Sequence, residues 1–303
     1  MGKVKENMQR ADEIIEAARF SKLDLLVLPE MAFTGYNFPS LAAITPYLEP
    51  TASGPSTAWA IRTARRLHCT VTVGYPERTL TTPSRNYNAT ITISPSGDVI
   101  AAYHKSFLYY TDETWASEGH GFFVKPLPGL DRLGGLAGTG GEKLVAHGIC
   151  MDINPYRFEA PWDAYEFAQH CVRGGAELVV LSMAWLTRLL PQEITVQPSQ
   201  PDTETLSYWV QRFQPIIKGG RDEGVVVVCA NRSGVEGSEF NGEQGRGIDG
   251  LGNDVVYAGS SCVLFIQKGA VQVFDMLGKA EEKLLVVDTS QPPKFGLQQG
   301  NVG

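Results

Sequence analysis

Short apolar runs alternate along the chain with longer stretches in which apolar residues recur every three or four positions. Residues 5–20 show the second pattern, with Met8, Ala11 and Ile14 on one face of an expected helix. Residues 23–28 show the first pattern, which is typical of a strand buried on both faces. These patterns predict a helix followed by a buried strand.

The same two patterns continue along the rest of the chain. Further helices are expected at 55–67, 162–173 and 203–223, and Pro215 should kink or split the last of them. Further strands are expected at 69–75, 88–93, 99–103, 144–149, 178–183, 225–229, 255–266, 271–274 and 284–287. Strands that alternate with helices, with hairpins between some of them, predict an α/β fold with a mixed sheet. We expect one domain over residues 1–303.

Composition narrows the class of protein. The sequence is 43% hydrophobic, no apolar run is long enough to cross a bilayer, and residues 1–12 lack the apolar core of a signal peptide. The formal net charge of −7 argues against nucleic acid as a partner, because such binding depends on clustered Lys and Arg. We therefore expect a cytoplasmic protein that binds neither membranes nor nucleic acid.

The cysteines and histidines do not suggest a metal site. The five cysteines are widely spaced without a C-x-x-C pair, and the five histidines show no metal-ligand spacing. No metal or organic cofactor is expected. Any one of these cysteines, taken alone, is more often a small buried hydrophobe than a nucleophile.

Three chemically active residues each follow a predicted strand. Glu30 follows the strand at 23–28, Lys105 follows 99–103, and Cys150 follows 144–149. Taken singly, Glu30 and Lys105 are interpreted as solvated loop charges. Their shared placement favours a site, because sites in α/β folds assemble at strand ends.

The three residues together can hydrolyse an amide. Cys150 would attack as a thiolate, and Lys105 would lower the pKa of the thiol and stabilise the oxyanion together with the backbone N–H of Met151. Glu30 would accept the thiol proton, pass it to the departing ammonia and later activate water. The sequence thus predicts a cysteine-dependent amide hydrolase.

At these residues the chain resembles the nitrilase (carbon–nitrogen hydrolase) superfamily. Leu-Val-Leu-Pro-Glu30, Tyr-His-Lys105 and Gly-Ile-Cys150-Met-Asp152 are similar to its Glu, Lys and Cys motifs, in the same order. The resemblance implies a four-layer α-β-β-α sandwich. It also implies that Glu113, eight residues after Lys105, is a second active-site Glu that positions Lys105 and substrate.

The segment from Cys150 to Trp162 is longer than in most branches and is most similar to the fungal protein N-terminal amidases. That resemblance implies hydrolysis of the side-chain amide of an N-terminal Asn or Gln in proteins and peptides. The products, Asp or Glu and ammonia, would feed N-terminus-dependent degradation. Two alternatives stay open: a small-molecule amidase or carbamoylase of the same superfamily, and an inactive protein that binds peptide N-termini.

Two polar residues just after the nucleophile are candidates for binding the substrate's α-ammonium. They are Asp152 and Asn154, since a cationic amine needs carboxylate or carbonyl partners. The alternative for Asp152 is that it only braces the turn at Cys150.

The start of the sequence departs from the family pattern. Family members begin with a buried strand before the first helix, whereas Gly2-Lys3-Val4 already lies at the helix expected here. The first strand is expected to be missing, as in an N-terminally truncated chain. Family members commonly pair, so either a monomer or a homodimer is expected.

Overall fold

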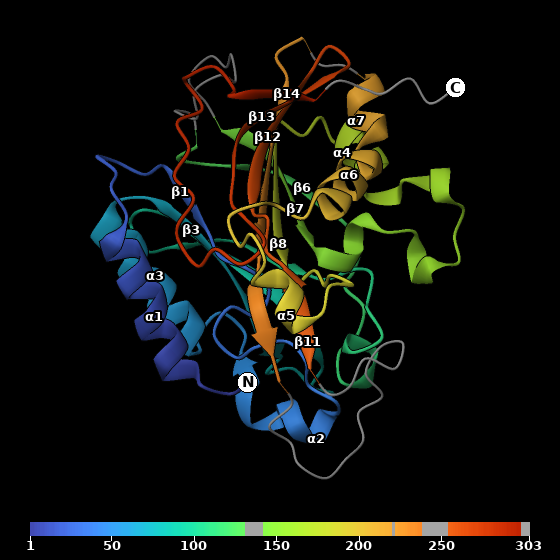
Figure 1. Cartoon of the computed structure of the whole chain (residues 1–303). Helices are drawn as coiled ribbons and strands as arrows, with labels where there is room; N and C mark the ends of the chain where they lie inside the picture. Colours follow the sequence, from blue (N-terminus) through green and yellow to red (C-terminus); the bar gives the residue numbers. More distant parts are fainter. Residues whose placement is uncertain (131–141, 220–221, 238–253, 298–303) are drawn as a thin grey trace.

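Two β-sheets lie face to face between two layers of helices in the computed structural model (Figure 1). The structure describes residues 1–130, 142–219, 222–237 and 254–297. None of the helices in these ranges is long and apolar enough to cross a membrane.

The first sheet carries the N-terminal third of the chain. In it β1 and β2 run parallel to β3, and β3, β4 and β5 are antiparallel in the order β1-β3-β4-β5. Two helices cover its outer face, and Trp59 packs there against Val71 and Val73. The elements are α1 (Val4–Ala17), β1 (Leu25–Val27), α2 (Leu41–Ile44), β2 (Glu49–Pro50), α3 (Pro55–Leu67), β3 (Thr70–Arg78), β4 (Asn86–Ile93) and β5 (Val99–His104).

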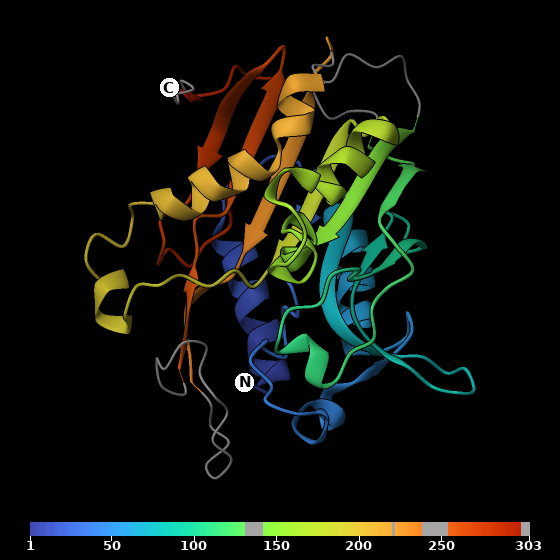
Figure 2. The ribbon, with the colours of Figure 1, turned by 90° about the vertical axis from the view of Figure 1, so that its right-hand side faces the viewer.

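The second sheet has three central parallel strands with antiparallel neighbours, in the order β14-β13-β12-β9-β8-β7-β6. The helices α4, α6 and α7 cover its outer face (Figure 2). Phe167, Trp209 and Phe213 are buried in the core on this side of the sheet. The elements are β6 (Phe123–Leu127), β7 (Lys143–Ile149), α4 (Glu166–Arg173), β8 (Leu178–Met183), α5 (Pro191–Ile194), α6 (Thr203–Arg212), α7 (Gln214–Gly219), β9 (Val225–Asn231), β12 (Cys262–Gln267), β13 (Ala270–Met276) and β14 (Phe295–Leu297). A separate ribbon pairs β10 (Ser233–Glu236) with β11 (Val255–Ala258).

The inner faces of the two sheets contact each other directly. The ring of Tyr103 on β5 lies 6.3 Å from that of Phe123 on β6, and Thr92 on β4 lies within 3.4 Å of the imidazole of His147 on β7. This layering confirms the expected α-β-β-α sandwich.

Three expected elements differ in detail. The helix at 203–223 splits after Arg212, three residues before Pro215, and Phe213 alone separates α6 from α7, as the proline predicts. The strand at 255–266 is two strands, because Gly259 and Ser260 take left-handed backbone angles between them. The predicted strand at 284–287 is wrong: this segment pairs with no described strand.

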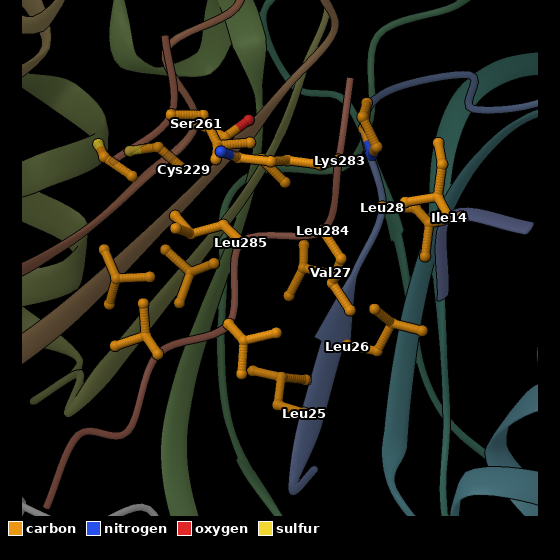
Figure 3. A pocket seen from close by; sticks show the side chains of 18 of the residues that line it. Ile14, Leu25, Leu26, Val27, Leu28, Cys229, Ser261, Lys283, Leu284 and Leu285 are labelled. Atoms are coloured by element: carbon orange, nitrogen blue, oxygen red, sulfur yellow. The ribbon is translucent and has the colours of Figure 1, made fainter. Parts of the chain in front are cut away.

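The edge of the first sheet borders a cavity. Among the described strands β1 pairs only with β3, on one side. A cavity of about 700 Å³ lies beside β1, lined by Leu25, Val27 and Leu285 together with residues of α1 and β9 (Figure 3). The segment 284–287 lines the same cavity. The cavity is thus bordered by β1 and by 284–287, two stretches that both have the apolar composition of strands.

Candidate active site

Strand ends bring the three predicted residues together. Glu30 lies three residues beyond β1, Lys105 follows β5 directly, and Cys150 follows β7 directly. The backbone stays in register past the strand ends, since Leu28 N–H donates to Thr72 and Lys105 N–H donates to Asn88. The side chains are therefore held by rigid backbone.

Lys105 lies between two carboxylates. Its Nζ is 2.7 Å from Glu30 Oε1 and 2.5 Å from Asp112 Oδ2, and all three side chains are completely buried. Burial of a charge without a partner is very unfavourable, so the two carboxylates and the ammonium depend on one another. Glu30 also accepts a hydrogen bond from Ala184 N–H at 2.8 Å, just after β8.

Asn88 connects the two carboxylates. Its Nδ2 donates to Glu30 Oε1 at 2.6 Å and to Asp112 Oδ1 at 3.0 Å. Neither Asn88 nor Asp112 is among the site residues expected from the sequence. Asn88 has no local signal beyond being a polar residue in a predicted buried strand, and Asp112 is one acidic residue away from the expected Glu113.

The structure places Asp112, and not Glu113, beside Lys105. Glu113 is exposed, and its side chain makes no hydrogen bond or ion pair with the part of the chain that the structure describes. Both residues lie in one turn of 3₁₀ helix (Asp112–Thr114), and that turn directs Asp112 inward. The carboxylate beside Lys105 is thus that of Asp112, and the positioning role expected of Glu113 stays a prediction.

Cys150 lies on a strained turn. Its φ of 41° is left-handed, a conformation that is uncommon in a residue with a side chain and that is found where surrounding structure enforces it. Met151 follows it in a short 3₁₀ helix (Cys150–Ile153). The backbone N–H of Met151 lies in the first turn, where helical N–H groups lack an acceptor within the helix.

Asp152 holds this turn in place. Its carboxylate accepts from Ile149 N–H and Tyr103 O–H at 2.8 Å, and from Ser106 N–H at 3.0 Å and Phe107 N–H at 2.9 Å. These bonds join the nucleophile turn to the residues just after Lys105. They support the alternative interpretation of Asp152 as a brace, since its oxygens are already occupied.

Asn154 is also engaged inside the protein. Its Oδ1 accepts from Tyr208 O–H, and its Nδ2 lies 3.3 Å from the sulfur of Met151. Asn154 is 4% exposed. Asn154 Oδ1 keeps a second lone pair, so binding of a substrate ammonium by Asn154 stays a prediction.

Electrostatics define the resting state of the site. The pKa of the Cys150 thiol lies well above its usual value because of burial and the nearby Glu30, and Lys105 lowers it only in part. Burial likewise raises the pKa of Glu30, against the effect of Lys105. Burial would lower the pKa of Lys105, but Asp112 and Glu30 outweigh it and raise that pKa.

These shifts revise the expected activation. Lys105 is a fixed ammonium, and Cys150 rests as a thiol rather than as a thiolate. The thiol must therefore lose its proton during attack, and Glu30 is the carboxylate beside it that can accept that proton. Within the described ranges, no cluster of three or more His, Cys, Asp or Glu forms a metal site.

A model of the carbon–nitrogen hydrolase family matches residues 2–155, which include Glu30, Lys105 and Cys150. A Schizosaccharomyces pombe protein named protein N-terminal amidase is 32% identical over 302 residues, 94% of each chain. This chain belongs to the carbon–nitrogen hydrolase family. A Saccharomyces cerevisiae protein of the same name is 32% identical over 61% of this chain and 42% of its own.

Solved structures agree on the fold of this family member. A crystal structure of an N-terminal amidase with an Asn-Glu-Ala peptide superposes with a TM-score of 0.74 at 21% identity, over 92% of each chain. A carbon–nitrogen hydrolase from Helicobacter pylori superposes with a TM-score of 0.64 at 16% identity, over 93% of this chain and 83% of that one.

Proposed function

We propose that the protein hydrolyses the side-chain amide of an N-terminal Asn or Gln in peptides and proteins, through a thioester on Cys150. The observation that carries this proposal is the buried Glu30–Lys105–Asp112 cluster beside a strained cysteine. The relatives named protein N-terminal amidase supply the substrate class.

The first half of the reaction forms the thioester. Glu30 accepts the Cys150 proton as the sulfur attacks the amide carbon. The resulting oxyanion is stabilised by the Lys105 ammonium and the Met151 N–H. Glu30 then gives its proton to the nitrogen, the C–N bond breaks, and ammonia leaves.

The second half hydrolyses the thioester. Glu30 takes a proton from water, the hydroxide oxygen attacks the carbonyl carbon, and the same two donors stabilise the second oxyanion. The C–S bond breaks, and the proton on Glu30 returns to the sulfur. The peptide leaves with an N-terminal Asp or Glu, and none of these steps requires a metal or an organic cofactor.

We place the reaction in the cytoplasm, where its acidic products would enter N-terminus-dependent degradation. All five cysteines are free thiols, as in proteins of reducing compartments.

Ammonia release from matched peptides tests the proposal. Peptides that begin with Asn or Gln should release one ammonia each, and the same peptides acetylated at the α-amine should not. Cys150→Ala should abolish release and still fold. Equal turnover of the acetylated peptides would reject the N-terminal assignment and favour a general amidase, whereas binding without ammonia release would indicate an inactive binding protein.

A further inference from the structure

The segment that carries the nucleophile is strained well beyond Cys150. Arg157 and Phe158 have φ of 53° and 58°, and Tyr165 has φ of 44°. Left-handed angles at residues with side chains are unfavourable by about 1 kcal/mol or more each, so contacts from elsewhere must hold this segment in shape. The hydrogen bonds of Asp152 hold only the first residues of this segment in place.

Arg212, a buried arginine of α6, holds the remainder of this segment at two points. Arg212 Nε donates to the carbonyl of Ile153 at 2.7 Å, and its Nη1 donates to the carbonyl of Trp162. Its guanidinium lies 4.6 Å from the ring centroids of Trp162 and of Tyr165. A planar group with several donors can bind two carbonyls and two rings together, which an ammonium cannot.

A second side chain reaches the same segment from one helical turn earlier. Tyr208 and Arg212 are four residues apart and lie on one face of α6. Tyr208 O–H donates to Asn154 Oδ1, and Asn154 in turn contacts the sulfur of Met151. Met151 carries the backbone N–H that we assign to the oxyanion, so this chain of contacts ends next to the reacting atoms.

We propose that Tyr208 and Arg212 are positioning residues, which hold the 150–165 segment so that Cys150 faces Glu30 and Met151 N–H faces the oxyanion. This inference rests on the proposed role of Cys150 as nucleophile. Both residues act through their contacts with this segment. Small displacements of a nucleophile lower a rate strongly, since 1 Å can lower it about a hundredfold.

Two variants test the role, with a matched control. Tyr208→Phe removes one hydroxyl, and Arg212→Lys keeps the charge but cannot bridge both carbonyls. Arg65→Lys is the control, because Arg65 also donates to a backbone carbonyl, that of Ser96, but on the surface of the other sheet. For each protein we would measure kcat and KM on an Asn-peptide, the melting temperature, and alkylation of Cys150 by iodoacetamide at pH 7, followed by mass spectrometry.

We expect kcat to fall about tenfold in Tyr208→Phe and up to about a hundredfold in Arg212→Lys, with KM within about twofold of wild type. Alkylation of Cys150 should slow in the same order, and the control should match wild type in both. Unchanged kcat, or alkylation at or above the wild-type rate, in folded Tyr208→Phe would overturn the proposal, even if Arg212→Lys does not fold. Alkylation needs no substrate, so this result is separate from whether the peptide specificity is right.

Discussion

Lys105 Nζ lies 2.7 Å from Glu30 Oε1 with both side chains sealed from solvent. Glu30 follows β1 and Lys105 follows β5, the first and last strands in the order of the first sheet, and the pair lies near Cys150 of the second sheet. An ammonium and a carboxylate at this distance and depth stabilise each other's charged forms. The site therefore contains a fixed cation and a proton acceptor before substrate arrives.

Removing the cation should damage both activity and stability. Lys105→Met leaves Glu30 and Asp112 buried without a counter-charge, so we expect a loss of about 3–5 kcal/mol in the free energy of unfolding at pH 7. Turnover should fall by at least about a hundredfold, as for other lost oxyanion donors. Urea unfolding and ammonia release would measure these effects. The double variant Glu30→Gln/Lys105→Met should regain part of the stability but none of the activity; stability no better than in the single variant would contradict the coupling.

The roles of Asp112 and Glu113 can be separated with two isosteric changes. Asp112→Asn weakens the hold on Lys105, and we expect kcat to fall about tenfold to a hundredfold because a charged hydrogen bond is lost. Glu113→Gln alters an exposed side chain, so its kcat should stay within about twofold of wild type. If Glu113→Gln is the more damaging variant in steady-state kinetics, the residue implied by the family resemblance is right after all.

The two interpretations of Asp152 predict different kinetics. If it braces the turn, Asp152→Ala leaves three backbone N–H groups without an acceptor and removes the carboxylate that accepts from Tyr103. Because three backbone N–H groups lose their acceptor, while Tyr103 keeps Ser106 as a partner, we then expect a lower melting temperature, about 3 kcal/mol less stability, and a lower kcat. If it binds substrate, KM for free N-terminal peptides should rise while the melting temperature stays constant. Asp98→Ala, in the surface hairpin turn, is the control for loss of a turn carboxylate.

His147 should make stability depend on pH. Burial between the sheets lowers the pKa of His147 from 6.5 to about 4. In the unfolded chain the His147 imidazole is therefore protonated below about pH 6.5, whereas in the folded protein it is protonated only below about pH 4. Stability should fall as pH falls through this window, by up to about 3 kcal/mol from this group. His147→Gln should flatten that part of the pH profile of urea unfolding, whereas His120→Gln, on the surface, should leave it unchanged.

The cavity beside β1 allows the expectation of a missing first strand to be tested. An apolar strand-forming extension fused before Met1 should pair with the edge of β1 that no described strand occupies and fill part of the 700 Å³ space. We expect a melting temperature several degrees higher and slower hydrogen exchange at the amides of Leu25 and Val27. A Gly-Ser extension of equal length is the control, and equal melting temperatures for the two extensions would contradict the expectation.

The order of elements and three of the site residues were predictable from local pattern. Buried strands leave short continuous apolar runs, and Glu30, Lys105 and Cys150 stand at or just beyond the ends of such runs. The segment at 284–287 shows the limit of this reasoning. Its composition is that of a strand, but a strand needs a neighbour to pair with, and no described strand provides one.

What the sequence by itself determined was the α/β class, the strand ends that carry the chemistry, and the type of chemistry. Only the tertiary structure decided which side chains meet. Asp112 reaches Lys105 because a single turn points it inward, Asn88 joins two carboxylates from a different strand, and Arg212 reaches back from 50 residues beyond Trp162. These contacts depend on long-range packing, which cannot be deduced from the spacing of residues in the sequence.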